Sequence, residues 1–188
     1  MKNVRNLKMS IAYISMIAAI AAVSVALVLY ARKVSQRRIV ASIPGIAVPM
    51  CEYRCGKITG IYVGGEVFDG AGASKLSQLR SLEELQLDYT GISDRDLIVL
   101  TELPRLKTLW LYDKKVSDEG IEIISRLKHL RTLSLRLHQV SSFAFKKLAR
   151  VKQLRRLEVN IEKLDNLAVD FVASELPNCE ILRVDDAE

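Results

Sequence analysis

An apolar ladder with a constant step of 24 residues runs through most of this chain. Each rung has three apolar residues, in which the second follows the first by three positions and the third follows by two more. A repeat of fixed period is typical of stacked architectures, in which no single unit can bury its apolar face alone. A sixth rung, Cys179-Leu182-Val184, arrives one residue late. The five regular rungs are Ile58-Ile61-Val63, Leu82-Leu85-Leu87, Leu106-Leu109-Leu111, Leu130-Leu133-Leu135 and Leu154-Leu157-Val159.

The second half of each repeat has a different periodicity from the rung. In the second repeat the later apolar residues are Ile92, Leu97, Leu100 and Leu103, and equivalent positions are apolar in the other repeats. The rung has the period of two that a strand requires, whereas the later residues have the spacing of one helix face. The sequence therefore predicts one strand and one helix in every repeat.

Residues 58–184 resemble the leucine-rich repeat family, whose pattern L-x-x-L-x-L-x-x-N/C-x-L is matched by Leu82, Leu85, Leu87 and Ile92. The resemblance implies an α/β solenoid with a parallel β-sheet on the concave face and helices on the convex face. This chain lacks the family's Asn/Cys, and only Thr90 resembles a substitute, in a segment similar to bacterial variants of the repeat. We therefore expect a less regular edge there. The residues at the Asn/Cys position are Glu66, Thr90, Lys114, His138 and Glu162.

Residues 9–31 form an uninterrupted stretch of 23 residues without a charge, proline or glycine. About 20 apolar residues in a helix span the ~30 Å hydrocarbon core of a bilayer. We predict a single transmembrane helix over 9–31, preceded by a short basic tail at 1–8. The alternative is a cleaved signal peptide, but the stretch is longer than the apolar region of about 7–15 residues in such peptides.

The net charge of +6 belongs to the N-terminal segment. Residues 1–40 contain seven of the 28 basic residues and none of the 22 acidic ones, which leaves residues 41–188 with a net charge of −1. Nucleic acid is therefore not an expected partner. The basic residues on the two sides of the apolar stretch balance each other, so the positive-inside rule does not choose an orientation. They are Lys2, Arg5 and Lys8 on one side and Arg32, Lys33, Arg37 and Arg38 on the other.

Residues 32–57 are predicted to form a juxtamembrane helix and an N-terminal cap for the repeats. Pro44-Gly45 ends the helix, and an added edge strand is expected to follow. The cap contains Cys51 and Cys55, which are either a disulfide, in an extracytoplasmic domain, or two reduced thiols. Mainly because of these cysteines, we expect a single-pass membrane protein with its repeat domain outside the cytoplasm. That domain spans 58–188, with repeats starting near 58, 82, 106, 130, 154 and 179.

The other metal-binding residue types do not complete a zinc site around this cysteine pair. A structural zinc ion needs four ligands, and Cys179, His129 and His138 lie far away in the repeat frame. No metal or other cofactor is therefore expected. Cys179 opens a rung and is interpreted as a small core residue.

Polar and charged residues mark the two edges of the predicted sheet. Paired capping residues begin the helices at Ser93-Asp94, Ser117-Asp118, Ser141-Ser142 and Asp165-Asn166. Basic residues gather at the opposite edge, where they complement the helix dipoles. Residues 123–157 contain ten Lys/Arg and no Asp or Glu, so we expect a continuous basic rim. The rim is either a solvated edge or a surface for an acidic protein or anionic lipid. Its residues are Arg126, Lys128, Arg131, Lys146, Lys147, Arg150, Lys152 and Arg155.

The register of the rungs places the only tryptophan, Trp110, on the concave face and away from the core. One column of outward positions contains Tyr62, Gln86, Trp110, Ser134, Glu158 and Arg183, and the next contains Gly64, Asp88, Tyr112, Arg136, Asn160 and Asp185. Aromatic and arginine side chains dominate the binding energy of protein interfaces. The alternative is a cross-strand stacking pair that only stabilises the sheet. The candidate partner-binding residues are Tyr62, Asp88, Trp110, Tyr112, Arg136 and Glu158.

Catalytic motifs are missing from the sequence. The two histidines lie nine residues apart on different elements, and there is neither a nucleophile elbow nor an H-E-x-x-H motif. We therefore predict a membrane-anchored leucine-rich repeat protein, not an enzyme, that acts as a protein-protein interaction scaffold through its concave face. The alternative is a structural or tethering protein whose basic rim binds anionic lipid or an acidic polymer.

Overall fold

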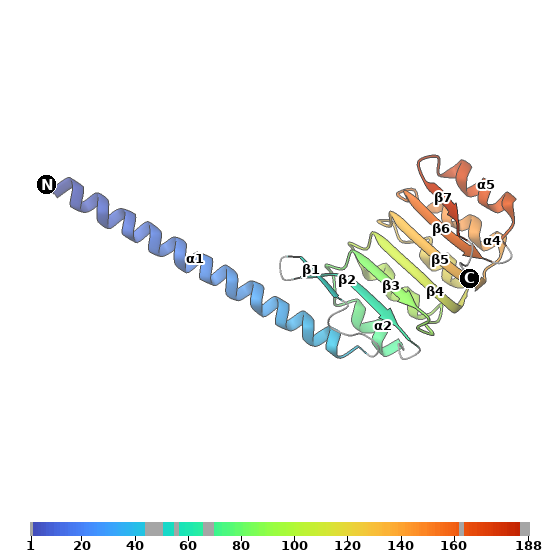
Figure 1. Cartoon of the computed structure of the whole chain (residues 1–188), viewed down its shortest axis with the longest axis horizontal. Helices are drawn as coiled ribbons and strands as arrows, with labels where there is room; N and C mark the ends of the chain where they lie inside the picture. The colour runs from blue at the N-terminus through green and yellow to red at the C-terminus, as the bar shows by residue number, and fades with distance from the viewer. Residues whose placement is uncertain (1, 44–50, 55–56, 66–69, 162–163, 185–188) are drawn as a thin grey trace.

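A long N-terminal helix leads into a curved sheet that is backed by short helices (Figure 1). This computed structural model describes residues 2–43, 51–54, 57–65, 70–161 and 164–184, with the side chains of the first helix described from Ala18. The strands are β1 (Cys51–Arg54), β2 (Lys57–Gly64), β3 (Glu84–Asp88), β4 (Thr108–Ser117), β5 (Thr132–Gln139), β6 (Arg156–Ile161) and β7 (Glu180–Arg183). The helices are α1 (Lys2–Ala41), α2 (Gly70–Leu76), η2 (Asp96–Glu102), α3 (Asp118–Ile124), α4 (Ser142–Phe145), η3 (Lys146–Arg150) and α5 (Asn166–Glu175).

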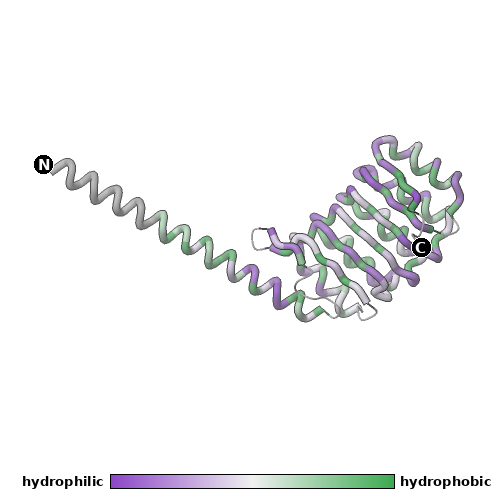
Figure 2. Tube along the Cα trace, viewed as in Figure 1, coloured by the Kyte–Doolittle hydropathy of each residue, from purple (hydrophilic) through white to green (hydrophobic). Residues whose placement is uncertain are grey.

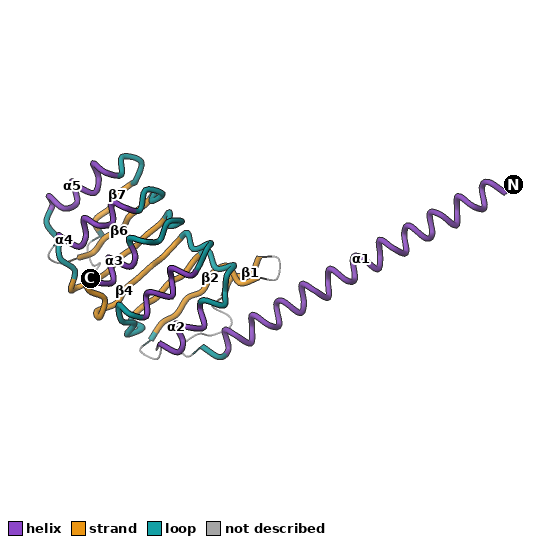
Figure 3. The backbone as a smooth tube through the Cα atoms, turned by 180° about the vertical axis from the view of Figure 1, so that it is seen from behind, coloured by secondary structure: helices purple, strands orange, loops and turns teal. Residues whose placement is uncertain are grey.

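The seven strands form one sheet in sequence order, from β1 to β7. Strand β1 is antiparallel to β2, and all later pairs are parallel, with Leu85, Leu109 and Leu133 aligned across three strands. The helices cover the opposite face of the sheet from the concave one, as Figure 3 shows from behind. The α/β leucine-rich repeat architecture predicted from the sequence is therefore confirmed.

The core is a single layer of apolar side chains between the sheet and the helices. Rung residues such as Leu82, Leu85 and Leu87 are fully buried, as are Leu97 and Leu100 on the facing helix η2. Each buried leucine contributes roughly 1.5–3 kcal/mol relative to an exposed one. The constant 24-residue step lets equivalent leucines stack on one another along the solenoid.

A buried carboxylate at Asp113 ties the turn that an asparagine would tie in other repeats of this kind. Its Oδ2 atom accepts hydrogen bonds from the Thr90 hydroxyl (3.1 Å) and the Gly91 amide (2.7 Å), and its Oδ1 atom accepts one from the Lys115 amide (3.0 Å). Thr90 is fully buried and Gly91 has a φ of +72°, which favours glycine. Thr90 therefore replaces the asparagine of the repeat only together with Asp113 of the next repeat.

A second polar ladder connects neighbouring repeats at the starts of the helices. At each step, a residue of one repeat accepts a hydrogen bond from the amide of the capping residue in the next repeat. Two aspartates accept from a serine hydroxyl as well, at 2.6 Å. The connected pairs are Asp94 with Ser117, Asp118 with Ser141, and Ser142 with Asp165. This ladder orders the edge that we expected to be less regular.

The predicted capping residues occupy the starts of three helices. The side chains of Ser117, Ser141 and Asp165 each accept a hydrogen bond from an amide in the first turn. Ser93 behaves differently, because its hydroxyl donates to Asp96 (2.6 Å) and the short η2 helix begins after it. The capping prediction is confirmed for three repeats and wrong for Ser93.

The register of the last strand differs from the one we expected. Ile181, not Leu182, is aligned with Leu157, and Arg183 is aligned with Val159. The backbone sets this register, because the Glu180 amide donates to the Arg155 carbonyl and thereby continues the ladder of earlier strands. The expected rung Cys179-Leu182-Val184 is therefore wrong, since Cys179 and Ile181 are the residues that pack against the core. Arg183 also leaves the concave column, and Asp185 lies outside the described residues.

Helix α1 continues without a break from the apolar stretch through residues 32–41, the first part of the segment in which we predicted a juxtamembrane helix. Figure 2 shows its apolar segment giving way to a polar one before the solenoid begins. At its end, Val40 and Ile43 are buried, and the Gln36 side chain accepts a hydrogen bond from the Ile58 amide of β2. The Lys75 ammonium donates to the Ser42 carbonyl. The helix is thus packed directly onto the first repeat.

The cap cysteine that the structure describes is a free thiol. Cys51 is partly buried, and this burial raises the pKa of its thiol. Cys55 and Pro44-Gly45 lie outside the described residues. Within the described ranges, no group of three or more His, Cys, Asp or Glu side chains is arranged to hold a metal ion.

Candidate functional site

The concave face carries the predicted partner-binding residues on five neighbouring strands. Alternation along β2 to β6 turns Tyr62, Asp88, Trp110, Tyr112 and Arg136 away from the buried rungs, and all of them are partly exposed. Glu158 follows on β6 and is also partly exposed. The structure therefore places these residues on one continuous surface.

A hollow of about 170 Å³ lies beside Trp110 at the start of the sheet. Tyr62 and Trp110 supply aromatic walls, and Glu52 and Glu84 add two exposed carboxylates. Gly60 keeps the hollow open, because a Cβ atom there would lie 3.1 Å from the Cβ atom of Glu52. The hollow is large enough for one apolar side chain and has acidic groups at its margin.

Trp110 lacks an aromatic neighbour on the adjoining strands. Its register partners are Gln86 on β3 and Ser134 on β5. A stacking pair that only stabilises the sheet would require an aromatic ring at one of these positions. The exposure of Trp110 is therefore not explained by cross-strand stacking at its own register.

Tyr62 and Asp88 form a coupled pair on β2 and β3. Burial raises the pKa of Tyr62, and the charge and hydrogen bonding of the neighbouring Asp88 carboxylate raise it further. The other contact of Asp88 is a hydrogen bond from the Gln86 side chain at 2.9 Å. Its Oδ1 atom is buried and has no hydrogen-bond partner within the described residues. Leaving a buried carboxylate oxygen without a hydrogen-bond partner is costly.

Tyr112 and Arg136 form a second pair, on β4 and β5. The guanidinium of Arg136 lies 5.0 Å from the centre of the Tyr112 ring, and the Tyr112 hydroxyl is 3.1 Å from Ser134 Oγ. A cation over an aromatic face is attractive and limits the motion of both side chains. The pair thus presents a pre-positioned positive charge next to Trp110.

Glu158 belongs to a separate ion network at the far end of the face. Its carboxylate lies 2.7 Å from Arg156, which also reaches Glu180 at 3.4 Å. The hydrogen bond from Arg156 to Glu158 raises the pKa of that guanidinium. From β1 to β5, the concave face carries first the acidic residues Glu52, Glu84 and Asp88, then the aromatic residues Trp110 and Tyr112 on β4, and then the basic residue Arg136 on β5.

Five lining residues of the Trp110 hollow were not among the candidate partner-binding residues, namely Glu52, Gly60, Ile61, Glu84 and Gln86. Gly60 and Glu84 occupy equivalent positions two residues before the Tyr62 column, so the repeat frame contained the signal for them. Glu52 comes from β1, which pairs antiparallel with β2 and lies outside the frame. No repeat-based register could have placed Glu52.

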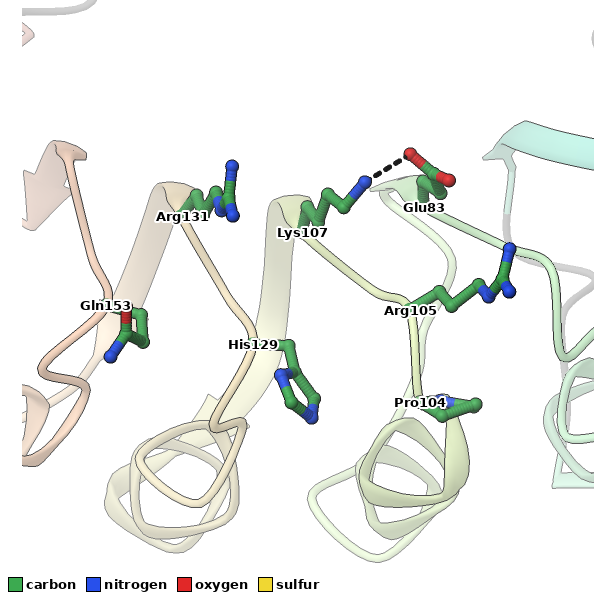
Figure 4. A pocket seen from close by; sticks show the side chains of 7 residues that line it. All are labelled: Glu83, Pro104, Arg105, Lys107, His129, Arg131 and Gln153. Carbon is green, nitrogen blue, oxygen red and sulfur yellow. Dashed lines mark hydrogen bonds and ion pairs between the residues drawn. The ribbon is translucent and has the colours of Figure 1, made fainter.

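The basic residues that we predicted as a rim lie in two groups. One group lines a hollow of about 320 Å³ at the start of the strands, where Lys107 and Arg105 lie closest to Glu83, and His129 and Arg131 follow on the next repeat (Figure 4). Lys107 is 2.7 Å from Glu83, and this hydrogen bond lowers the pKa of the Glu83 carboxyl. Arg126 and Lys128 line the neighbouring hollow. Arg155 is exposed just before β6.

A second group lies on the convex helices, and acidic residues from outside the 123–157 segment neutralise part of it. Glu122 contacts Lys147 (2.8 Å), Arg150 (2.9 Å) and Arg126 (3.6 Å). Lys152 contacts Glu175 at 3.0 Å, while Lys146 lines the same convex surface. Arg126 lines the hollow next to the first group and also contacts Glu122 in the second, and the continuous basic rim stays a prediction.

The comparison with protein families agrees with the repeat frame. The model of the Zer-1-like leucine-rich repeats matches residues 73–181, which is more than half of the chain. No curated protein sequence matches the chain significantly. Leucine-rich repeat domains are typically scaffolds for protein binding rather than enzymes. With five in-phase repeats, a parallel sheet and this family match, the chain belongs to the leucine-rich repeat family.

Proposed function

We propose that this chain is a membrane-anchored scaffold that binds a partner protein through its concave face. The observation that carries the proposal is Trp110, the only tryptophan, partly exposed in a hollow without an aromatic neighbour at its register. Tryptophan is enriched among the residues that dominate interface energies. Concave surfaces are also where repeat proteins bind their partners.

The arrangement of the face favours a partner segment that lies across the strands. An apolar side chain of that segment would fill the hollow beside Trp110, and a donor would meet the exposed carboxylates of Glu52 and Glu84 at its margin. Further along, an acidic group would meet Arg136, which already lies over Tyr112. Tyr62, Asp88, Trp110, Tyr112 and Arg136 are thus assigned to binding. Glu158, which is paired with Arg156, is assigned to the margin of the site.

Helix α1 is proposed to be the single membrane-spanning segment. The part from Ala18 to Ala41 is long and apolar enough to cross a bilayer. Its apolar side chains, such as Val23 and Leu27, are more than half exposed. Alkaline carbonate washing should leave the full chain in the membrane pellet, and release into the supernatant would contradict the anchor. We propose that the repeat domain faces away from the cytoplasm, which protease protection in intact cells would test.

Substitution of Trp110 tests the binding face directly. We expect Trp110→Ala to weaken binding of a co-purifying partner by about tenfold or more, the loss of a strong interface anchor. Ile98→Ala is the matched control, since Ile98 is an exposed apolar residue on the convex helix η2. Unchanged partner binding by a folded Trp110→Ala variant would support a purely structural role for the tryptophan.

The runner-up function is tethering through the basic residues at the start of the strands. The observation in its favour is the hollow lined by Arg105, Lys107 and Arg131 with Glu83 as its single acidic residue. Binding through these exposed charges should fall steeply as salt rises above physiological ionic strength, where the Debye length is about 8 Å. Arg131→Glu should abolish it, whereas binding through the concave face should respond to Trp110→Ala and only weakly to salt.

A further inference from the structure

A groove of about 440 Å³ lies on the convex face, on the other side of the sheet from Trp110. It is formed where α4 and η3 meet α5 of the next repeat. The apolar lining comes from Phe143, Phe171 and Ala149, and the basic lining includes Lys146, Lys147 and Arg150. We refer to it as the Phe143–Phe171 groove.

The two phenylalanine side chains are exposed, although a phenylalanine on the same helix is buried in the core. Phe143 is 75% exposed and Phe171 is 43% exposed, while Phe145 on the same helix α4 is fully buried. The repeat does not require an apolar residue at the position of Phe143, because the equivalent residues in the two preceding repeats are Arg95 and Glu119. Clustered exposed aromatic side chains of this kind mark interaction surfaces.

Cations are held over both rings. Lys147 Nζ lies 5.6 Å from the centre of the Phe143 ring, and Lys146 Nζ lies 5.6 Å from the centre of the Phe171 ring. Lys147 also contacts Glu122, but Lys146 has no carboxylate within 4.0 Å among the described residues. The equivalent of Lys146 is Ile98 two repeats earlier and Glu122 one repeat earlier, so the helix dipole does not dictate a lysine there.

We propose that the Phe143–Phe171 groove binds an acidic peptide segment of a partner protein that also carries an aliphatic or aromatic side chain. The apolar side chain enters the recess between the rings, and the carboxylates meet Lys146 and the neighbouring cations. The four cations that line the groove, Lys146, Lys147, Arg150 and Lys152, outnumber the single carboxylate among its described lining residues, Glu175, so its charge complements an acidic segment. This site lies on a different face from Trp110, and the result of its test does not decide whether the concave face binds a partner.

Selection from a library of short random peptides displayed on phage tests the proposal. The target is the full chain in phosphatidylcholine nanodiscs, with selection repeated on the Phe143→Ser and Lys146→Glu variants. Both side chains are exposed, so the variants are expected to fold, which circular dichroism would check. Ile98→Ser is the matched control, because Ile98 is 53% exposed on another convex helix.

We expect enriched peptides to combine Asp or Glu with one large apolar residue. The affinity of a synthesised enriched peptide should fall about tenfold or more with Phe143→Ser and with Lys146→Glu, and it should be unchanged with Ile98→Ser. Enrichment without acidic residues, or binding that survives Phe143→Ser, overturns the proposal. It is also overturned if Phe143 is needed instead for binding vesicles of phosphatidylcholine and phosphatidylserine, or for self-association of the chain.

Discussion

The Asp113 side chain replaces the asparagine that holds the turn after the strand in other leucine-rich repeats. Its carboxylate is buried and accepts hydrogen bonds from Thr90, Gly91 and Lys115. The bonds join the turn after β3 to the strand of the next repeat. A side chain of one repeat therefore holds the backbone of the preceding one.

Removal of the Asp113 carboxylate should be strongly destabilising. We expect Asp113→Ala to lower the free energy of unfolding by about 3 kcal/mol, because the buried Thr90 hydroxyl and the Gly91 amide would lose their acceptor. Urea unfolding followed by the fluorescence of the single tryptophan, Trp110, measures the change. Lys114→Ala, at the exposed neighbouring position, should change stability little, and an equal loss in both variants would contradict the role of Asp113.

Glu122 should titrate below the usual range of a glutamate. The hydrogen bond from Lys147 holds the pKa of its carboxyl down, with a further contribution from Arg150. Because the folded-state pKa is depressed, the stability that Glu122 contributes is present above its unfolded pKa and is lost as the pH falls through the folded pKa. Carbon-detected NMR titration should show this pKa rising in Lys147→Ala, whereas an unshifted pKa would contradict the ion pair.

At this scale the register predicts which residues point outward, but not what they contact. The rung spacing was sufficient to place Trp110 and Tyr112 on the concave face. It could not reveal Asp113 as the partner of Thr90, because position 113 faces a turn whose path depends on the neighbouring repeat. Glu52 could not be predicted for a similar reason, since it lines the hollow beside Trp110 from an antiparallel strand outside the repeat.

At the level of the elements, each capping residue at the start of a helix also forms a hydrogen bond with the preceding repeat. Asp118 accepts both the amide and the hydroxyl of Ser141, at 2.7 and 2.6 Å. Ser141 in turn accepts from the Ala144 amide in the first turn of α4. One carboxylate thus orients the cap of the following helix.

Loss of this carboxylate should loosen the following helix. We expect Asp118→Ala to cost about 1–2 kcal/mol, similar to the loss of a helix cap. Hydrogen exchange should show faster exchange in α4 and η3 than in the distant helix η2. Glu119→Ala is the control, since Glu119 is exposed at the adjacent position. Uniformly faster exchange over all helices would instead indicate a global effect.

The elements themselves were predictable wherever the 24-residue frame held. Strands β2 to β6 and a helix in each intervening segment follow from the frame, although η2 and η3 are 3₁₀ rather than α-helices. At β7 the 24-residue step also holds, and our expectation of a rung one residue late, from the spacing of Cys179 and Leu182, was wrong. Backbone pairing aligns Leu157 with Ile181, the residue that a step of 24 from Leu157 would have predicted.

At the scale of the whole molecule, the solenoid presents three separate surfaces, of which the sequence analysis had predicted the concave face and the basic edge but not the convex groove. Trp110 lies on the concave face, Arg131 at the edge where strands begin, and Phe143 on the convex helices. Helix α1 is joined to the first repeat through Gln36 and Val40.

Site-specific photo-crosslinking in intact cells tests the concave face as the binding surface most directly. A photoreactive residue at Gln86, the strand neighbour of Trp110, should capture a discrete partner protein. The same adduct should disappear when Trp110→Ala is added, and it should not form from the convex position Ile98. An adduct that persists in Trp110→Ala, or that forms equally from Ile98, would contradict binding through the concave face.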